Sequence, residues 1–163
     1  MAINKKNLKI YFFLFLFFLI FFLIIKNLNN EKELIIKPIS VNLLTSVHPD
    51  LSWNFKPLKS KIFVTPGEVV NVEYMVENFS DKKSTGIATF AYFPNQYGSY
   101  ISKLNCFCYD AQTLNPGQKE KFTLVILIDP EVTKDSKTKD IKEVTIQFIF
   151  FDYKKYKKKK IKI

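Results

Sequence analysis

Both cysteines of the chain lie in the stretch Asn105–Asp110, where Phe107 separates Cys106 from Cys108. The residues before them, 100–104, are rich in strand formers and contain no Gly or Pro, which predicts an extended segment. Because residues two apart on a strand point to the same face, we expect the two thiols to stand side by side, with Phe107 turned away. Paired soft sulfur ligands suit Cu(I), so the cysteines are candidate copper ligands.

The same pair has two structural interpretations. The cysteines can be small buried hydrophobic residues, or they can form a disulfide in an oxidising compartment. Same-face neighbours on a strand have Cα atoms about 7 Å apart, at or beyond the limit of disulfide geometry. An intrachain bridge is therefore expected to be strained and easily reduced, and spacing alone leaves all three interpretations open.

The residues around the cysteines have less specific roles. We expect Phe107 to pack in the core behind the site, while Tyr109 and Asp110 either contact a partner or close the strand. Trp53 and Phe55 are predicted to be core anchors. The single histidine, His48, is expected in an exposed loop. Two cysteines and one histidine fall short of the four ligands of a closed zinc site, so zinc is not expected.

The charge and the missing motifs exclude several classes of function. The net charge is +10, and all 25 basic residues are Lys, which argues against a nucleic-acid partner because such sites usually use Arg. A heavy use of Lys, Asn, Ile and Phe is also what AT-rich coding would produce. The sequence has no nucleophile elbow, no glycine-rich phosphate loop and no Cys-x-x-Cys motif, so an enzyme is not expected.

The first 38 residues of the sequence predict an anchored protein. A short basic lead, 1–9, precedes the uninterrupted apolar run 10–25, which we interpret as a transmembrane anchor with the N-terminus in the cytoplasm. The alternative is a cleaved secretory signal, but no small-x-small cleavage site follows the run. Residues 26–38 are polar without a clear period and are predicted to be a linker.

Residues 39–153 predict one all-β domain. Short alternating runs are separated by turn signals such as Pro66-Gly67, and no 3.6-residue stripe follows Lys26, which favours an immunoglobulin-like antiparallel β-sandwich. Residues 85–93 are apolar on both faces, as in a central strand. The Lys-rich tail, 154–163, is expected to be a solvated disordered end, with contact to anionic lipid headgroups as the alternative. The predicted strands cover 39–45, 58–65, 70–76, 85–93, the cysteine segment, 122–128 and 144–150.

A series of short motifs in a fixed order resembles the cytochrome c oxidase assembly protein family called CtaG in bacteria, which has a mitochondrial counterpart. The likeness runs from about residue 39 to 151. The motifs are Leu51-Ser52-Trp53-Asn54-Phe55-Lys56-Pro57, Thr65-Pro66-Gly67-Glu68, Thr85-Gly86-Ile87-Ala88-Thr89, Cys106-Phe107-Cys108-Tyr109, Leu114-Asn115-Pro116-Gly117 and Ile128-Asp129-Pro130-Glu131.

The resemblance implies a membrane-anchored copper chaperone. Its cargo is Cu(I), received from a periplasmic donor and delivered to the copper-B centre of cytochrome c oxidase subunit I. It implies a single-pass protein of the bacterial inner membrane with its domain in the periplasm, or of the mitochondrial inner membrane facing the intermembrane space. Cys106 and Cys108 fall on the family's Cys-Phe-Cys copper motif, with Tyr109 where Phe is usual, and copper-loaded copies are expected to form a homodimer.

One departure from the family pattern concerns a further cysteine that usually follows the membrane span. Residues 26–38 contain none, so a step that uses that thiol is in doubt for this chain. The alternative function is an anchored immunoglobulin-like interaction module whose cysteines are structural.

Overall fold

The computed structural model describes residues 5–28 and 37–161, which belong to two compact units, an N-terminal helix and a β domain. The helix α1, Lys5–Leu28, contains the whole apolar run. In the part of the chain that the structure describes, no helix is both long and apolar enough to cross a membrane. The membrane-spanning anchor over residues 10–25 stays a prediction, to which the structure adds that this run is helical. Residues 5–9 of the predicted lead are the start of α1, whereas residues 1–4 of the lead and 29–36 of the predicted linker lie outside the described residues.

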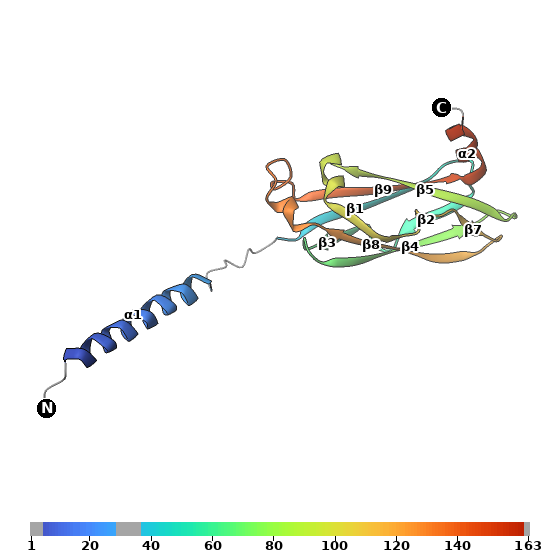
Figure 1. Ribbon diagram of the computed structural model, residues 1–163. Coiled ribbons are helices and arrows are strands. Elements are labelled where there is room, and N and C mark those ends of the chain that lie inside the picture. Colours follow the sequence, from blue (N-terminus) through green and yellow to red (C-terminus); the bar gives the residue numbers. More distant parts are fainter. Residues whose placement is uncertain (1–4, 29–36, 162–163) are drawn as a thin grey trace. The chain divides into compact units, whose positions relative to one another are not determined.

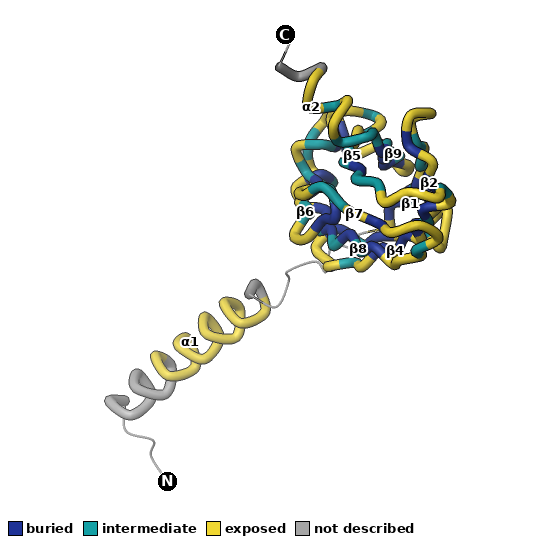
Figure 2. Tube along the Cα trace, turned by 90° about the vertical axis from the view of Figure 1, so that its right-hand side faces the viewer, coloured by how far each residue is buried: buried dark blue, intermediate teal, exposed yellow. Residues whose placement is uncertain are grey.

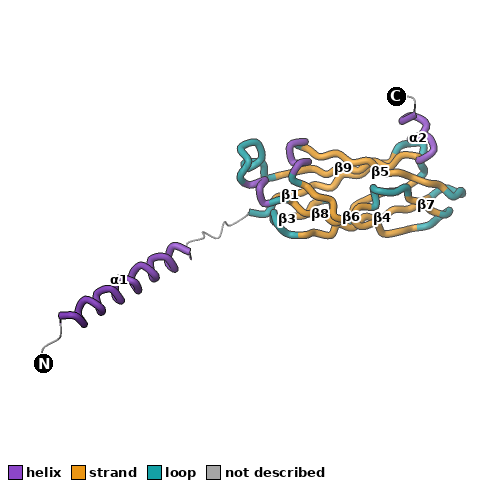
Figure 3. The backbone as a smooth tube through the Cα atoms, in the orientation of Figure 1, coloured by secondary structure: helices purple, strands orange, loops and turns teal. Residues whose placement is uncertain are grey.

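The β domain consists of two sheets that face each other across one core (Figures 1 and 3). The five-stranded sheet has the order β3 (Lys61–Val64), β1 (Ile39–Val47), β9 (Glu143–Asp152), β5 (Ser84–Phe93) and β7 (Gln112–Leu114). The four-stranded sheet has the order β2 (Trp53–Pro57), β4 (Val69–Asn78), β8 (Lys119–Ile128) and β6 (Ile101–Cys106). The short helices η1 (Asn95–Ser99) and η2 (Pro130–Thr133) and a C-terminal helix, α2 (Tyr153–Ile161), complete the domain.

Alternation along the strands builds the core. Every second residue is buried from Val72 onward in β4, from Phe122 onward in β8 and from Val144 to Phe150 in β9. These buried positions, dark blue in Figure 2, form the core between the two sheets. The predicted anchors Trp53 and Phe55 are both buried, and the Phe55 ring lies 4.9 Å from that of Phe150, between centroids, across the two sheets. The prediction of a β domain with these two core anchors is confirmed.

The pairing of the first and last strands corrects the purely antiparallel prediction. β1 runs parallel to β9 over eight residue pairs, from Ser40 beside Glu143 to Val47 beside Phe150. Turn signals specify how neighbouring strands connect, but they carry no information about two strands a hundred residues apart. The direction of this pairing therefore comes from the closure of the whole sheet.

The position of β5 is also different from the prediction. Its first three residues pair with β7, whereas residues 87–93 have a partner strand, β9, on one side only. Phe90 and Phe93 are consequently exposed in spite of their apolar sequence context. The strand is thus central only at its start, because β7 is too short to cover the rest.

The Lys-rich tail is helical rather than disordered over residues 154–161, which corrects the prediction for that segment. Asp152 caps α2, since its Oδ1 accepts a hydrogen bond from the backbone N–H of Lys155 at 2.9 Å.

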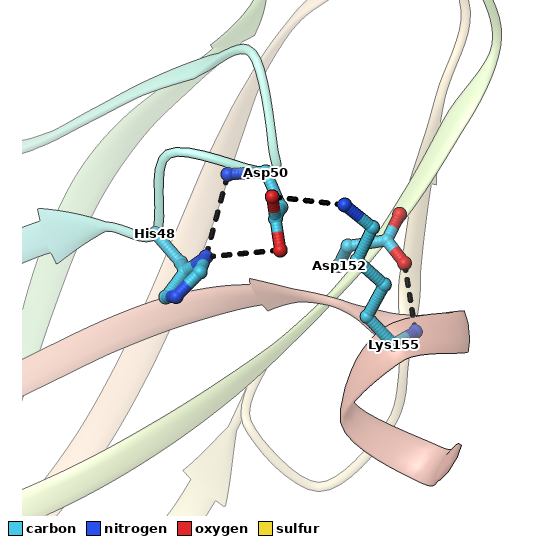
Figure 4. A network of polar contacts seen from close by, with 4 residues as sticks. All are labelled: His48, Asp50, Asp152 and Lys155. Atoms are coloured by element: carbon cyan, nitrogen blue, oxygen red, sulfur yellow. Dashed lines mark hydrogen bonds and ion pairs between the residues drawn. The ribbon is translucent and has the colours of Figure 1, made fainter. Parts of the chain in front are cut away.

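Lys155 also forms an ion pair with Asp50 at 2.8 Å, and Asp50 lies 3.4 Å from Nδ1 of His48 (Figure 4). His48 is exposed in the loop after β1, as predicted.

Candidate metal centre

The cysteine segment ends a strand rather than continuing it. β6 stops at Cys106, and a register shift between Lys103 and Asn105 places Leu104 as an extra residue opposite β8. This bulge turns the Cys106 side chain inward, and the residue, which lies opposite Leu124 of β8 in the strand register, is only 5% exposed. The prediction of an extended chain through both cysteines is therefore wrong, because the bulge and the turn that follows change the direction of the backbone.

Cys106 and Cys108 are joined by a disulfide, and their Cα atoms are 5.0 Å apart. The turn shortens the separation expected for same-face strand residues, which brings the pair within ordinary disulfide spacing. The backbone N–H of Tyr109 closes the turn by donating to the carbonyl oxygen of Cys106 at 3.2 Å. The sequence-based expectation that strand geometry opposes a bridge does not apply to this backbone.

Phe107 fixes the centre of the turn. It is 8% exposed, and its ring lies between the aromatic side chains of both sheets. The predicted packing of Phe107 in the core is confirmed, and the two cysteines flank the residue that anchors the turn. The rings within contact distance belong to Phe55, Tyr74, Phe122, Phe148 and Phe150.

Two polar side chains hold the outer part of the turn. Nε2 of Gln112 donates to the carbonyl oxygens of Phe107 at 2.9 Å and Asp110 at 3.3 Å. The Tyr109 hydroxyl donates back to the carbonyl oxygen of Lys103 on β6. Tyr109 thus supports the end of the strand while its side chain stays 56% exposed, and Asp110 is exposed with it.

Lys103 lies on β6, near the start of this turn, and its side chain reaches the rings of Phe90 and Tyr92 on β5. Its Nζ is 3.3 Å from the centroid of the Phe90 ring and donates a hydrogen bond to the Tyr92 hydroxyl at 3.1 Å. Burial lowers the pKa of Lys103, because charge is disfavoured away from water. Burial, with a smaller contribution from Tyr109, raises the pKa of Tyr92 to about 12.

The described residues contain no cluster of three or more His, Cys, Asp or Glu side chains that could hold a metal ion. His48 lies in another loop and pairs with Asp50, so the structure does not bring it to the cysteines. Within the described part of one chain, the candidate ligand set is therefore the two sulfur atoms. Such a set matches the low coordination that Cu(I) accepts and does not match a closed zinc site.

Gln112 and Lys103 are the site neighbours that the sequence did not reveal. Gln112 lies on β7, whose three residues are too few to show an alternating pattern. Lys103 is one of 25 lysines and carries no local signal of its burial. Only the pairing of β5 with β7 and of β6 with β8 brings these side chains to the cysteine turn.

The chain is similar to proteins of known families. A family described as "Cytochrome c oxidase assembly protein CtaG/Cox11" matches residues 24–152. "Cytochrome c oxidase assembly protein CtaG" of Sinorhizobium fredii is 42% identical over 113 residues, which cover 69% of this chain and 57% of that protein. "Cytochrome c oxidase assembly protein COX11, mitochondrial" of Homo sapiens is 37% identical over 130 residues, which cover 80% of this chain and 46% of that protein.

This chain spans about half the length of the curated relatives that it matches. The matched region contains the cysteine turn, both sheets and the start of the domain at Ile39. The resemblance drawn from the ordered motifs is confirmed. The chain belongs to the cytochrome c oxidase assembly protein CtaG/Cox11 family.

Proposed function

We propose that this chain is a copper chaperone that carries Cu(I) on Cys106 and Cys108 and delivers it to the copper-B site of cytochrome c oxidase subunit I. The observation that supports it best is the family membership of residues 24–152, a region that contains the cysteine pair. The sulfur atoms are also the kind of soft ligand that Cu(I) prefers.

Copper loading requires that the disulfide be reduced first. A dithiol reductant supplies two electrons, is itself oxidised to a disulfide, and leaves Cys106 and Cys108 as free thiols. Binding of Cu(I) then displaces the protons of the thiols, because the thiolate is the metal ligand. Two sulfur ligands leave the ion open, so histidine imidazoles of the acceptor can replace them one at a time.

Two copies of the chain provide a fuller site than one. Each chain offers the two cysteine sulfurs as thiolates once they are reduced, and Cu(I) accepts a third sulfur ligand. The copper-loaded form is therefore proposed to be a homodimer in which thiolates of both copies share the metal. The donor that loads it is proposed to be another copper protein of the same compartment.

We place the protein at a membrane. The side chains of residues 13–25 on α1 are exposed and apolar, a surface that water disfavours and lipid accepts. We propose that the domain lies on the periplasmic face of the bacterial inner membrane or in the mitochondrial intermembrane space, and that its two sheets have an immunoglobulin-type arrangement. Co-sedimentation of the full chain with lipid vesicles, and its loss when residues 1–28 are removed, tests the attachment.

Cu(I) titration of the reduced full-length protein tests the ligand assignment. The wild type is compared with Cys106→Ser and Cys108→Ser, and with Met75→Leu as a control that removes another exposed soft side chain. We expect both cysteine variants to lose tight binding and the Met75 variant to keep it. Equal stoichiometry in all four proteins would exclude these cysteines as the ligands.

The burial of Cys106 and the disulfide favour one rival function, an interaction module with structural cysteines. Replacing both cysteines distinguishes the two. A structural pair predicts a lower thermal stability with oxidase assembly intact, whereas a chaperone predicts a folded domain and an oxidase without its copper-B ion.

A further inference from the structure

The two sulfur atoms of the disulfide lie in different environments. Cys106 points into the domain and is 5% exposed, next to the apolar side chains of β8. Cys108 follows the buried Phe107 in the turn and is only partly buried, packed against the outside of the core. A reagent in solution therefore has access to Cys108 that it does not have to Cys106.

A hydrogen bond adds to this difference. The backbone N–H of Cys108 donates to Sγ of Cys106, with the nitrogen and sulfur 3.1 Å apart. If the disulfide opens, negative charge collects on the sulfur that leaves, and a donor already aimed at that sulfur favours its departure. This donor is aimed at Cys106.

We propose that the disulfide is opened by thiol–disulfide exchange at Cys108, with Cys106 as the leaving sulfur. A thiolate of an external dithiol attacks Sγ of Cys108, the bond between the two cysteine sulfurs breaks, and its electron pair goes to Cys106. The mixed disulfide joins Cys108 to one sulfur of the dithiol. The second thiolate of the same dithiol then attacks that sulfur and releases Cys108. The dithiol ends as a disulfide, and its two protons end on the two cysteines.

The contacts that anchor the turn keep Cys106 buried, so the attack remains at Cys108. Exposing Cys106 requires the turn to rotate, which would withdraw the Phe107 ring from the core. It would also break the hydrogen bonds from Gln112 to the carbonyl oxygens of Phe107 and Asp110. The partner is therefore a dithiol that approaches over the exposed side chains of Tyr109 and Asp110, on the outer side of the turn.

This inference depends on the proposed function only for its purpose, since thiols must be free before copper binds. The exchange reaction itself contains no copper. Its failure and a failure of copper binding are therefore separate results.

Single-cysteine variants measure the difference in access. In the full-length protein, Cys106→Ser leaves Cys108 as the one thiol, and Cys108→Ser leaves Cys106. We expect the Cys108 thiol to react with Ellman's reagent about tenfold faster or more, because reaction rate follows exposure. Both variants are measured again in guanidinium chloride, where the ratio should fall toward one. A Cys106 thiol that reacts as fast as Cys108 in the folded protein would overturn the proposal.

A measurement on the wild type avoids any effect of substitution on folding. The oxidised protein is incubated with excess glutathione, freed thiols are alkylated with iodoacetamide, and the modified peptide is fragmented in a mass spectrometer. The proposal expects glutathione on Cys108 and the alkyl group on Cys106. The reverse assignment, or an even mixture, would contradict it.

Discussion

Phe107 is the residue at which the core and the candidate site meet. Its ring contacts aromatic side chains of both sheets, while its neighbours on either side are the two cysteines. Packing interactions inside the domain therefore determine the position of the sulfur atoms. A core substitution at this position is expected to affect both stability and the geometry of the site.

The substitution Phe107→Ala should lower the free energy of unfolding by about 3–5 kcal/mol, because it removes a buried ring and leaves a cavity. Urea denaturation followed by tryptophan fluorescence measures the change. Phe63→Ala is the matched control, since that ring is 70% exposed and its loss should change stability by less than about 0.5 kcal/mol. Similar losses in the two variants would contradict the role given to Phe107.

Tyr74 belongs to the same aromatic core but carries a polar hydroxyl group into it. Its hydroxyl is buried and has no hydrogen-bond partner among the described residues, and burial raises the pKa of the phenol. Tyr74→Phe removes only this atom, so we expect the free energy of unfolding to increase by about 1 kcal/mol. A decrease of that size in the same urea assay would show that the hydroxyl makes a stabilising contact.

At the scale of elements, turns outside the site hold the sheets together. Asn78, at the end of β4, is completely buried, and its Nδ2 donates to the carbonyl oxygens of Lys82, Leu114 and Asn115. Its Oδ1 accepts from the backbone N–H and the hydroxyl of Ser80. One side chain thus connects the turn after β4 with the turn between β7 and β8.

Asn78→Ala should lower the free energy of unfolding by about 2–3 kcal/mol, because it leaves buried carbonyl groups without a donor. Asn71→Ala on the same strand is the control, since Asn71 is exposed and little change is expected. Thermal unfolding of both variants provides the comparison, and equal melting temperatures would contradict the connecting role.

The contact between α2 and the loop after β1 should depend on pH. The hydrogen bond and charge of Lys155 hold the pKa of Asp50 below its ordinary value of 3.8. A folded-state pKa that is lowered contributes stability above the ordinary value and loses it as pH falls through the lowered value. The contact is therefore expected to weaken only below pH 3.8.

Comparison of the wild type with Asp50→Asn checks this expectation. The wild type should have the higher melting temperature at about pH 7, and the difference should shrink once the pH falls below 3.8 and through the lowered pKa of Asp50. A difference that stays constant over this range would show that the carboxylate charge is not responsible.

At the scale of the whole molecule, β9 closes the domain. It pairs with β1 on one side and β5 on the other, and it supplies four buried side chains to the core: Val144, Ile146, Phe148 and Phe150. The chain cannot form the centre of the five-stranded sheet until this last strand is present. Most of the domain's contacts are consequently between residues far apart in sequence, which slows folding in general.

Two truncations separate the role of β9 from that of the tail. A chain that ends at Asp152 lacks α2 and should keep the cooperative unfolding of the domain with a modest loss of stability. A chain that ends at Lys142 lacks β9 as well and should have no cooperative transition. Near-ultraviolet circular dichroism during urea denaturation measures both, and a folded chain ending at Lys142 would contradict the importance of this strand.

The sequence alone determined those features that depend on local order. The alternation of Val70, Val72, Tyr74 and Val76 predicts β4, because a strand with one buried face must repeat every two residues. The ordered motifs identify the family, and the cysteine pair marks the candidate site. Trp53 and Phe55 are recognisable as core residues because burial of large aromatic rings on a strand is strongly favoured.

The tertiary structure alone decided how these parts meet. The bulge at Leu104 depends on the register between β6 and β8, so the sequence of β6 could not show that Cys106 faces inward while Cys108 stays at the edge of the core. Gln112 reaches the turn only because β7 pairs with β5, and β1 pairs with β9 in parallel only because the sheet closes on itself. These features depend on contacts between distant residues, and a local pattern carries no information about such contacts.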